Sequence, residues 1–350
     1  MDNLLYLLIG AYTAGLSEGI YLYRFDSASG DAQYVHMVEM ENPSYIDTGN
    51  GIHFYAVTEN SDTPSYAHTL YFNREEEKLL RINSMETFAS SPCYIATDTH
   101  RTHAVTANYG GGSISVFGIQ GDTLLPSKQL IILEGSGADT LRQAAPHLHC
   151  VKFSPDGKYL FAADLGTDRI YRYEVNREGG DTAAFLNEKT MKPYPLPGGS
   201  GPRHLAFHPS NKYMYVVNEL SGTVTGFQYR EGELTEIQTV RADTLGGRAS
   251  ADVGITPNGR FLYASNRNKG DGIAIFSINE ANGQLTQVGY QPTGRHPRNL
   301  AITPNGKYLL AACLHSSLIE VFEIDGETGL LKNVNKNITD IDTPVVLKFL

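Results

Sequence analysis

Short apolar stretches alternate with polar turns along the whole chain. In one clear example, Leu205 and Phe207 alternate with other residues, the turn Pro209-Ser-Asn-Lys follows, and a second apolar run returns from Tyr213 to Val217. Alternation on both sides of a tight polar turn is typical of two antiparallel strands joined as a β-hairpin. The pattern therefore predicts a hairpin over this stretch.

A hairpin brings its two ends together, so polar residues at the ends of this one are expected to meet. Arg203 and His204 stand at its start, and Asn218 and Glu219 stand at its finish. The sequence therefore predicts that a guanidinium, an imidazole, an amide and a carboxylate gather at one edge of a sheet.

The same hairpin recurs along the chain as an internal repeat. Its turn has the form Pro-Asp/Asn-Gly-Lys/Arg after Ser154, Thr256 and Thr303, and a variant of it follows His208. The second strand of successive copies ends at Asn60, Asn108, Asp164, Asn218, Asn266 and Cys313, at intervals of 48, 56, 54, 48 and 47 residues. Intervals of this size fit one four-stranded blade of a β-propeller each.

A further copy is divided between the two ends of the chain. Residues 343–350 match the first strand of a blade, residues 4–10 match the second, and residues 19–25 match the third. Pairing the C-terminal strand with the N-terminal strands would close the ring and leave no open sheet edge there. We therefore predict an all-β fold, a single seven-bladed β-propeller domain that spans residues 1–350.

Composition supports this fold and narrows the possible functions. Hydrophobic residues make up 41% of the chain, and its 35 glycines and 21 tyrosines suit many short strands and turns. The chain has no Trp, so it lacks the Trp-Asp signature of one large propeller class. A net charge of −10 argues against nucleic acid as a partner, although a local arginine cluster can still bind a small anion.

The sequence predicts no membrane segment, no cofactor and no metal. No stretch approaches the ~20 apolar residues of a membrane-spanning helix. The acidic residue after Met1 is unlike a secretory signal, so we expect a cytoplasmic protein. The three cysteines lack a CxxC pair and are expected to be buried thiols. His147 and His149 share a strand face but have no third ligand at a suitable spacing.

The repeat places many polar residues around one mouth of the predicted propeller. Inner hairpin strands are antiparallel, so the start of the first and the end of the second lie on one face of the disc. The strand starts are His149, Arg203, Ala251 and Arg298, and the strand ends are Asp164, Asn218-Glu219, Asn266-Arg267 and Cys313-Leu314.

Each of these residues taken alone has a simpler interpretation. A histidine or asparagine at a strand end often supports a turn, and a rim arginine is often solvated. The presence of several such residues around one mouth favours a functional site over these simpler interpretations. Arg203, Arg267 and Arg298 would repel one another around one mouth unless an anion or a carboxylate lies among them. We therefore expect a pocket for an anionic ligand.

Six segments together resemble a known family, the seven-bladed propeller lactonases, whose bacterial members include 6-phosphogluconolactonase and whose relatives include fungal carboxy-muconate cyclases. The segments are Pro146-His-Leu-His149, Asp164-Leu-Gly-Thr-Asp-Arg-Ile170, Gly201-Pro-Arg-His204, Val217-Asn-Glu219, Leu262-Tyr-Ala-Ser-Asn-Arg267 and His296-Pro-Arg-Asn299. The resemblance implies that His149, Arg203, Glu219 and Arg267 form the active site. The chain departs from the family at Ala312-Cys-Leu314, where members commonly carry Ala-Asn-Gln, and at Asp252, where they favour Glu.

The resemblance implies hydrolysis of 6-phospho-D-glucono-1,5-lactone to 6-phosphogluconate, a step of the pentose phosphate pathway. His149 is then the better candidate for the general base, because an imidazole titrates near neutrality. Glu219 among arginines is expected to stay charged and to act as an anchor. Arg267 would stabilise the oxyanion, while Arg203 and Arg298 would hold the phosphate. The substrate-binding candidates are His147, His204, Asn218, Asn266 and Arg298.

Two other interpretations stay open from the sequence. A lactonising cyclase would use the same arginines to hold the carboxylates of its substrate. A non-catalytic propeller would bind a protein or peptide at the rim, because a fold alone does not fix a function.

Overall fold

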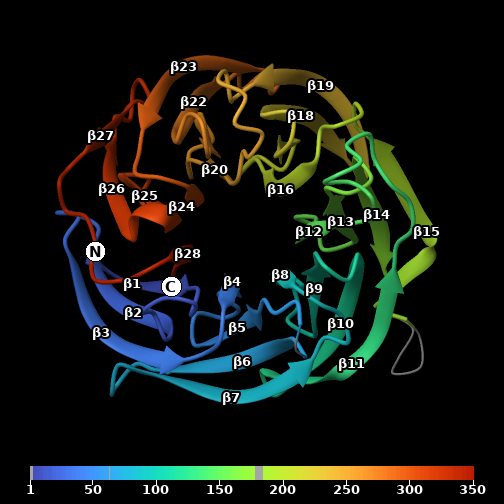
Figure 1. Ribbon diagram of the computed structural model, residues 1–350, viewed down its shortest axis with the longest axis horizontal. Helices are drawn as coiled ribbons and strands as arrows, with labels where there is room; N and C mark the ends of the chain where they lie inside the picture. Colours follow the sequence, from blue (N-terminus) through green and yellow to red (C-terminus); the bar gives the residue numbers. More distant parts are fainter. Residues whose placement is uncertain (1–2, 63, 178–183) are drawn as a thin grey trace.

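The computed structural model describes residues 3–62, 64–177 and 184–350. Seven four-stranded antiparallel sheets are arranged like blades around a central channel, with the first strand of each blade nearest the axis (Figure 1). The predicted seven-bladed β-propeller is therefore confirmed.

Within each blade the strands are given from the innermost outward. The first blade holds β28 (Pro344–Phe349), β1 (Leu4–Ala11), β2 (Gly19–Asp26) and β3 (Ala32–Glu39); the second holds β4 (Pro43–Asp47), β5 (His53–Thr58), β6 (Tyr66–Asn73) and β7 (Lys78–Glu86). The third holds β8 (Pro92–Thr97), β9 (His103–Asn108), β10 (Ser113–Gln120) and β11 (Thr123–Ile132); the fourth holds β12 (Leu148–Phe153), β13 (Tyr159–Asp164), β14 (Arg169–Val175) and β15 (Leu186–Pro195). The fifth holds β16 (Pro202–Phe207), β17 (Tyr213–Asn218), β18 (Thr223–Arg230) and β19 (Glu233–Arg241); the sixth holds β20 (Val253–Ile255), β21 (Phe261–Asn266), β22 (Gly272–Ile278) and β23 (Leu285–Pro292). The seventh holds β24 (Pro297–Ile302), β25 (Tyr308–Cys313), β26 (Leu318–Ile324) and β27 (Leu331–Asn333), with the short 3-10 helix η2 (Leu314–Ser316) after β25.

The ring closes through the two ends of the chain. β28 pairs antiparallel with β1, so that Ile9 lies opposite Leu347 and Leu7 lies opposite Phe349. The two termini accordingly lie side by side in Figure 1. This pairing confirms the predicted closure and removes the sheet edges that an open ring would leave exposed.

The repeated turn explains why the hairpins look alike in sequence. Its third residue takes a left-handed backbone, with φ of 67° at Gly157 and 74° at Gly259, a conformation that glycine adopts without strain. In the fifth blade Asn211 takes the same place with φ of 60°, and asparagine is among the few other residues that tolerate it. In the fourth-blade turn, the backbone N–H of Lys158 donates to Oδ1 of Asp156 at 3.1 Å.

The hydrophobic core lies between neighbouring blades. Every residue of β17, β21 and β25 is buried, because these strands are covered on both faces. Aromatic side chains join one blade to the next: the ring of Phe161 lies 5.9 Å from that of Phe207 and 6.0 Å from that of Tyr229. Rings at such distances add about 0.5–1.5 kcal/mol per pair beyond the area they bury.

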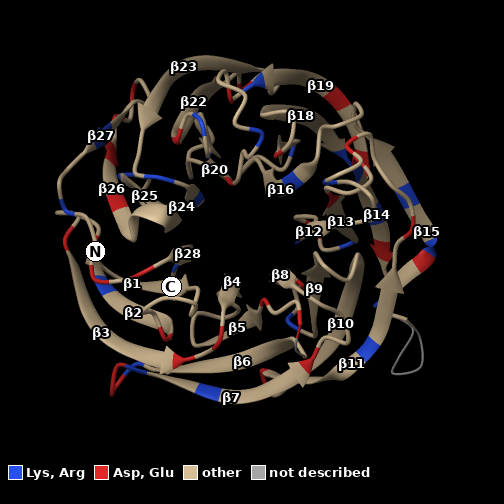
Figure 2. Ribbon diagram, viewed as in Figure 1, with Lys and Arg blue, Asp and Glu red and all other residues tan. Residues whose placement is uncertain are grey.

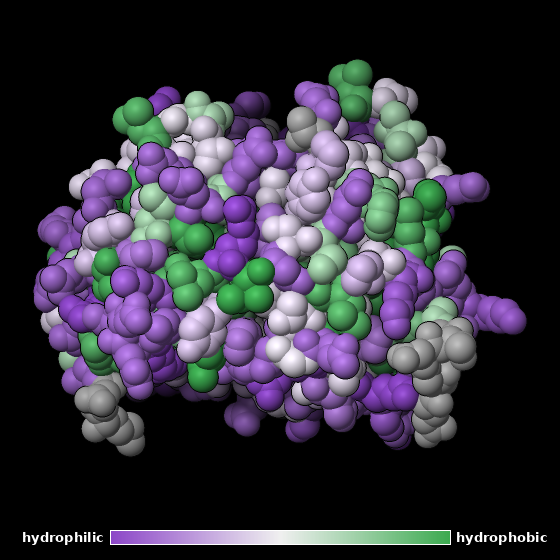
Figure 3. Space-filling view, turned by 90° about the horizontal axis from the view of Figure 1, so that it is seen from below, coloured by the Kyte–Doolittle hydropathy of each residue, from purple (hydrophilic) through white to green (hydrophobic). Residues whose placement is uncertain are grey.

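The outer strands present a largely polar surface. Seen from the side, hydrophilic residues cover most of the disc, and apolar side chains are scattered among them (Figure 3). Strands such as β11 alternate between exposed and less exposed positions along most of their length, as expected for a sheet with one solvated face. Among the residues that the structure describes, no helix has both the length and the apolar character needed to cross a bilayer.

Candidate active site

In six of the seven blades, a β-bulge near the start of the innermost strand directs one side chain toward the channel. In β12 the pairing with β13 shifts between Leu148 and Cys150, so His149 has no partner opposite it. Equivalent shifts leave Arg203 of β16 and Arg298 of β24 unpaired. Bulges bend a strand and redirect its side chains, which explains how these residues leave the regular alternation. The same irregularity occurs at Ser44, Cys93 and Val345.

The bulged residues line two cavities that share His149 and Arg298. The larger, about 260 Å³, is lined by His149 and Arg298 together with Glu59, Tyr109, Arg142, Glu219, Arg267 and His296. The smaller, about 10 Å³, touches all six bulged residues. Although the protein has a net negative charge, basic residues lie near the axis on β16 and β24 (Figure 2).

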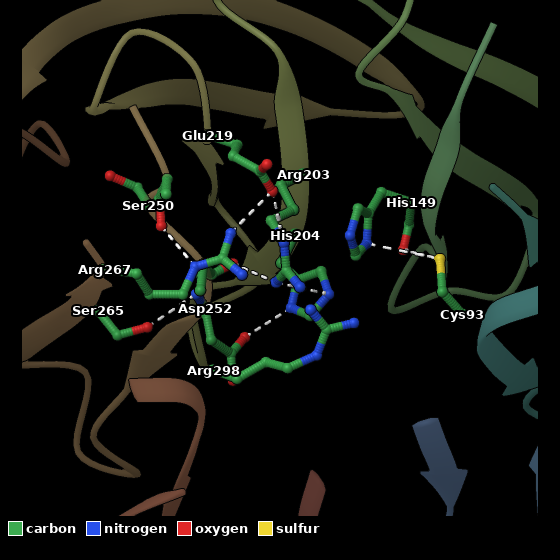
Figure 4. A network of polar contacts seen from close by, with 12 residues as sticks. Cys93, His149, Arg203, His204, Glu219, Ser250, Asp252, Ser265, Arg267 and Arg298 are labelled. Atoms are coloured by element: carbon green, nitrogen blue, oxygen red, sulfur yellow. Dashed lines mark hydrogen bonds and ion pairs between the residues drawn. The ribbon is translucent and has the colours of Figure 1, made fainter. Parts of the chain in front are cut away.

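Glu219 is the centre of a buried ion cluster in the larger cavity. Its Oε2 lies 3.0 Å from Nε of Arg203 and 3.0 Å from an Nη of Arg267, and its Oε1 accepts a 2.7 Å hydrogen bond from Arg142. The Arg203 contact is an ion pair rather than a well-aligned hydrogen bond. Figure 4 shows Arg203 and Arg267 converging on this carboxylate from two blades.

The arginines keep Glu219 ionised. Burial on its own would raise the pKa of this carboxyl, but Arg267, Arg203 and Arg142 together outweigh burial and lower the pKa to about 2. A carboxylate with so low a pKa is a poor general base at neutral pH. Glu219 therefore provides a counter-ion among the arginines.

Two of the arginines are held rigidly by further contacts. Arg203 is almost wholly buried and donates to the backbone oxygen of Ala251 at 2.6 Å. Arg267 donates to the backbone oxygen of Ala249 at 2.6 Å and to Nε2 of His296 at 3.1 Å. Arg267 lines the larger cavity, whereas Arg203 lines only the smaller one.

Arg298 belongs to a second cluster that contains residues the sequence analysis did not select. One of its Nη atoms donates to the hydroxyl of Tyr12 at 2.8 Å, and that hydroxyl donates to Glu59 at 2.7 Å. The same Nη lies 3.6 Å from the Glu59 carboxylate. Burial alone would lower the pKa of Arg298, but Tyr12 and Glu59 raise it above its ordinary value. Arg298 is therefore a firmly charged cation at the cavity wall.

His149 is a buried, neutral imidazole. Burial, followed by Arg203, His204 and Arg298, lowers its pKa well below the ordinary value of histidine. Its Nδ1 lies 3.6 Å from Sγ of Cys93, whose thiol also reaches the backbone oxygens of Leu148 at 3.6 Å and of His149 at 3.5 Å. If the thiol donates to these oxygens, Sγ accepts from Nδ1–H, and Nε2 of His149 carries the lone pair of a potential base.

His204 supports Arg203 from below the cluster. Its Nδ1 lies 2.7 Å from Oδ1 of Asp252, and its Nε2 lies 3.2 Å from an Nη of Arg203. Burial and Arg203 lower the pKa of His204 to about 4. A neutral imidazole thus donates to Asp252 and accepts from Arg203. Oδ2 of Asp252 accepts a further hydrogen bond from Asn299 at 2.5 Å.

Four residues predicted to bind substrate do not line the larger cavity. His147 stacks on Tyr109 with ring centroids 4.5 Å apart. Asn218 donates to the hydroxyls of two threonines of its own blade at 2.9 and 3.0 Å. Asn266 accepts from Ser250 at 2.6 Å and donates to a backbone oxygen at 3.0 Å. His204, the fourth, lines only the smaller cavity. The two asparagines support the blade edges, which is the simpler interpretation of such residues.

The sequence analysis also missed several residues of this site, among them Tyr12, Glu59 and Arg142. Glu59 directly follows β5, as Glu219 follows β17, so comparison of the repeats contained a signal for it. Arg142 lies in the long connection between β11 and β12, and no repeat position corresponds to it.

The three cysteines, Cys93, Cys150 and Cys313, are buried free thiols, as predicted. Within the described ranges, no group of three His, Cys, Asp or Glu side chains is arranged to hold a metal ion.

The fold and this cluster define a class of protein: a seven-bladed β-propeller with arginines, carboxylates and a histidine buried at one mouth of its channel. The chain belongs to the seven-bladed β-propeller lactonase family, whose model matches residues 6–349.

Curated relatives and solved structures of similar length match nearly the whole chain. A protein of Formosa agariphila named 6-phosphogluconolactonase is 34% identical over 94% of this chain and 95% of its own length. The Bacillus subtilis protein of the same name is 32% identical over 98% of this chain and 97% of its own. The solved structure of a periplasmic gluconolactonase from Pseudomonas aeruginosa is 31% identical, with a TM-score of 0.92 and coverage of 99% of both chains.

Proposed function

We propose that this protein hydrolyses 6-phospho-D-glucono-1,5-lactone to 6-phosphogluconate, the lactone-opening step of the pentose phosphate pathway. The observation that carries the proposal is the 260 Å³ cavity, which is lined by the neutral imidazole of His149 and by three guanidiniums, those of Arg142, Arg267 and Arg298. Two relatives that match nearly the whole chain are named 6-phosphogluconolactonase, which supports the same reaction.

In this proposal His149 activates the attacking water. Its Nε2 accepts a proton from water while the water oxygen bonds to the lactone carbonyl carbon. The ring C–O bond then breaks as the tetrahedral intermediate collapses, and the imidazolium returns the proton to the leaving alkoxide. Arg267 would donate to the oxyanion, because it lines the cavity and three contacts hold it in place.

The phosphate would lie between Arg298 and Arg142. Both line the larger cavity, and the side chain of Arg142 is 43% exposed, so it can reach an incoming ligand. Arg203 is reassigned to a positioning role, since it lies beneath the cavity and contacts Glu219 and His204. An anionic group between two guanidiniums gains charge-assisted hydrogen bonds to both.

A second candidate is hydrolysis of the unphosphorylated lactone. It is favoured by the printed name of the Pseudomonas aeruginosa structure, a gluconolactonase. The two candidates share every chemical step and differ only in the need for Arg298 and Arg142.

Initial rates on both lactones, corrected for spontaneous ring opening, test the proposal. Wild-type protein is expected to prefer the phosphorylated lactone, with kcat lost in His149→Ala and KM for that lactone raised in Arg298→Ala. Arg260→Ala is the matched control, because Arg260 is exposed at a turn and contacts Glu327 instead. Equal kcat/KM for the two lactones would favour the second candidate. No turnover of either would overturn both and favour a binding scaffold or a cyclase.

A further inference from the structure

A third cavity lies toward the opposite end of the channel. It has a volume of about 350 Å³ and is formed mainly by the C-terminal ends of β4, β8, β12 and β28, the innermost strands of four consecutive blades. We call it the lower cavity and define it by Tyr45, Asp47, Tyr94, Lys152 and Lys348. Because His149 and Lys152 are three residues apart on β12, the two ends are separated by roughly 10 Å along that strand.

Two lysines face the lower cavity. The Nζ atom of Lys348 donates to the hydroxyl of Tyr45 at 2.9 Å and lies 4.4 Å from the centre of the same ring. Lys152 lies on the neighbouring wall, and both lysines are partly buried. Burial first, and then the charge of Lys152, lower the pKa of Lys348 to about 8. The two ammonium groups are therefore close enough to destabilise one another.

The nearby carboxylates are already engaged. Oδ1 of Asp47 accepts from the hydroxyl of Thr97 at 3.0 Å and from the N–H of Gly49 at 2.8 Å, and its Oδ2 accepts from the N–H of Thr97 at 3.1 Å. Asp252 is bound to His204 and Asn299 on the other side. In the described part of the chain neither lysine forms an ion pair with a carboxylate within 4.0 Å.

The tyrosines separate the lower cavity from the candidate active site. Tyr45 and Tyr94 stack with ring centroids 3.7 Å apart, and the ring of His204 meets both edge to face at 6.0 and 5.4 Å. Tyr45 also borders the small cavity beneath Arg203. A ligand in the lower cavity would thus be held apart from the lactone by packed rings.

We propose that the lower cavity is a second anion site, which binds a phosphate group as inorganic phosphate or as a phosphate monoester. Two ammonium groups in one cavity match a group that carries close to two negative charges near neutral pH. The volume admits a phosphorylated metabolite of a few carbon atoms, and the threonine and serine residues of the wall supply polar surface. The site is independent of the proposed lactonase reaction, since it shares no lining residue with the larger cavity.

Competitive acylation of lysines, read by mass spectrometry on the wild-type protein, tests the site directly. Labelling is compared with and without inorganic phosphate, at an ionic strength balanced by sodium chloride. At a phosphate concentration about ten times the dissociation constant, labelling of Lys152 and Lys348 is expected to fall about tenfold. Lys158 and Lys212, which are exposed in turns, serve as internal references and should not change.

Variants and a second probe complete the test. Lys152→Met should abolish most of the protection of Lys348, while Lys158→Met should leave it intact. Glucose 6-phosphate that protects at lower concentration than inorganic phosphate would identify a monoester site, and the reverse would identify a free-phosphate site. Unchanged labelling in wild type, equal protection of the reference lysines, or full protection in Lys152→Met would each overturn the proposal. The labelling does not depend on lactone turnover, so this test of the lower cavity is valid whether or not the lactonase proposal holds.

Discussion

Nε of Arg203 lies 3.0 Å from Oε2 of Glu219, across the end of the hairpin formed by β16 and β17. The bulge at Arg203 makes this contact possible, because it directs the side chain toward the residue that follows β17. The same carboxylate also holds Arg267 of the sixth blade and Arg142 of a connecting segment. One carboxylate thus ties two neighbouring blades to the connection between β11 and β12.

Removal of this carboxylate should destabilise the protein. Glu219→Ala leaves three guanidiniums without their shared counter-ion, two of them buried, and loss of one partner of a buried pair costs on the order of 3–5 kcal/mol. Urea unfolding measures the change in the free energy of unfolding. Glu327→Ala is the control, because its ion pair with Arg260 is exposed and should be worth less than about 1 kcal/mol. Equal losses in the two variants would contradict the central role of Glu219.

The stability contributed by Glu219 should disappear in acid. Its folded pKa of about 2 lies below the ~4.3 of a free glutamate, so its contribution is fully present above pH ~4.3 and is lost as the pH falls toward 2. Wild-type protein should therefore lose unfolding free energy more steeply than Glu219→Gln between those two values. The measurement is urea unfolding at a series of pH values, and parallel curves for the two proteins would refute the assignment.

The pH dependence of turnover should reflect the low pKa of His149. Burial and the nearby Arg203 favour the neutral imidazole, so the base stays available below the ordinary histidine pKa of ~6.5. We expect kcat/KM on the phosphorylated lactone to hold as the pH is lowered through 6.5 and to decline only at more acidic values. An acid limb centred at or above ~6.5 would show that His149 is not the base.

Much of the fold could be predicted from the sequence repeat, because the backbone conformation of the repeated turn restricts which residues can occupy it. The turn requires a left-handed third residue, which limits it to Gly or Asn, so each hairpin leaves a recognisable trace at Gly157, Asn211 or Gly259. Three of the four expected strand starts coincide with bulges, which is why His149, Arg203 and Arg298 were selected correctly as residues that converge. The fourth expectation was wrong: Ala251 lies two residues before β20, whose pairing with β21 has no shift.

The rest of the site depends on register and on irregular segments. A shift of one residue moves a side chain to the other face of a strand, so sequence spacing alone does not show that Asn218 bonds to Thr223 instead of facing the channel. Arg142 comes from a connection without repeat partners, and only tertiary structure brings it to Glu219. The Tyr12–Glu59–Arg298 contact joins the first, second and seventh blades, which are adjacent only after the ring closes.

The contact between Cys93 and His149 should control the tautomer of the imidazole. Cys93→Ala removes the group that faces Nδ1 at 3.6 Å, so a larger share of the imidazole would carry its proton on Nε2 and be unable to accept one from water. We expect kcat to fall by about tenfold, within the range for general-base catalysis, with little change in KM. Cys313→Ala, which removes a buried thiol of the seventh blade, should leave kcat unchanged. The nitrogen chemical shifts of His149 would show the tautomer directly, and identical shifts in wild type and Cys93→Ala would contradict this role.

Tyr12 should position Arg298 for the phosphate. Its hydroxyl receives a 2.8 Å hydrogen bond from the guanidinium and passes one on to Glu59, so Tyr12→Phe frees Arg298 to move toward Glu59 alone. A hydrogen bond to a charged group is worth about 1.5–3 kcal/mol. If its loss weakens phosphate binding by the lower value, KM for the phosphorylated lactone should rise about tenfold. KM for the unphosphorylated lactone and kcat for both should change little. Tyr21→Phe, on the outer part of the first blade, is the matched control. A KM that rises equally for both lactones would mean that Tyr12 supports the cavity as a whole rather than the phosphate contact.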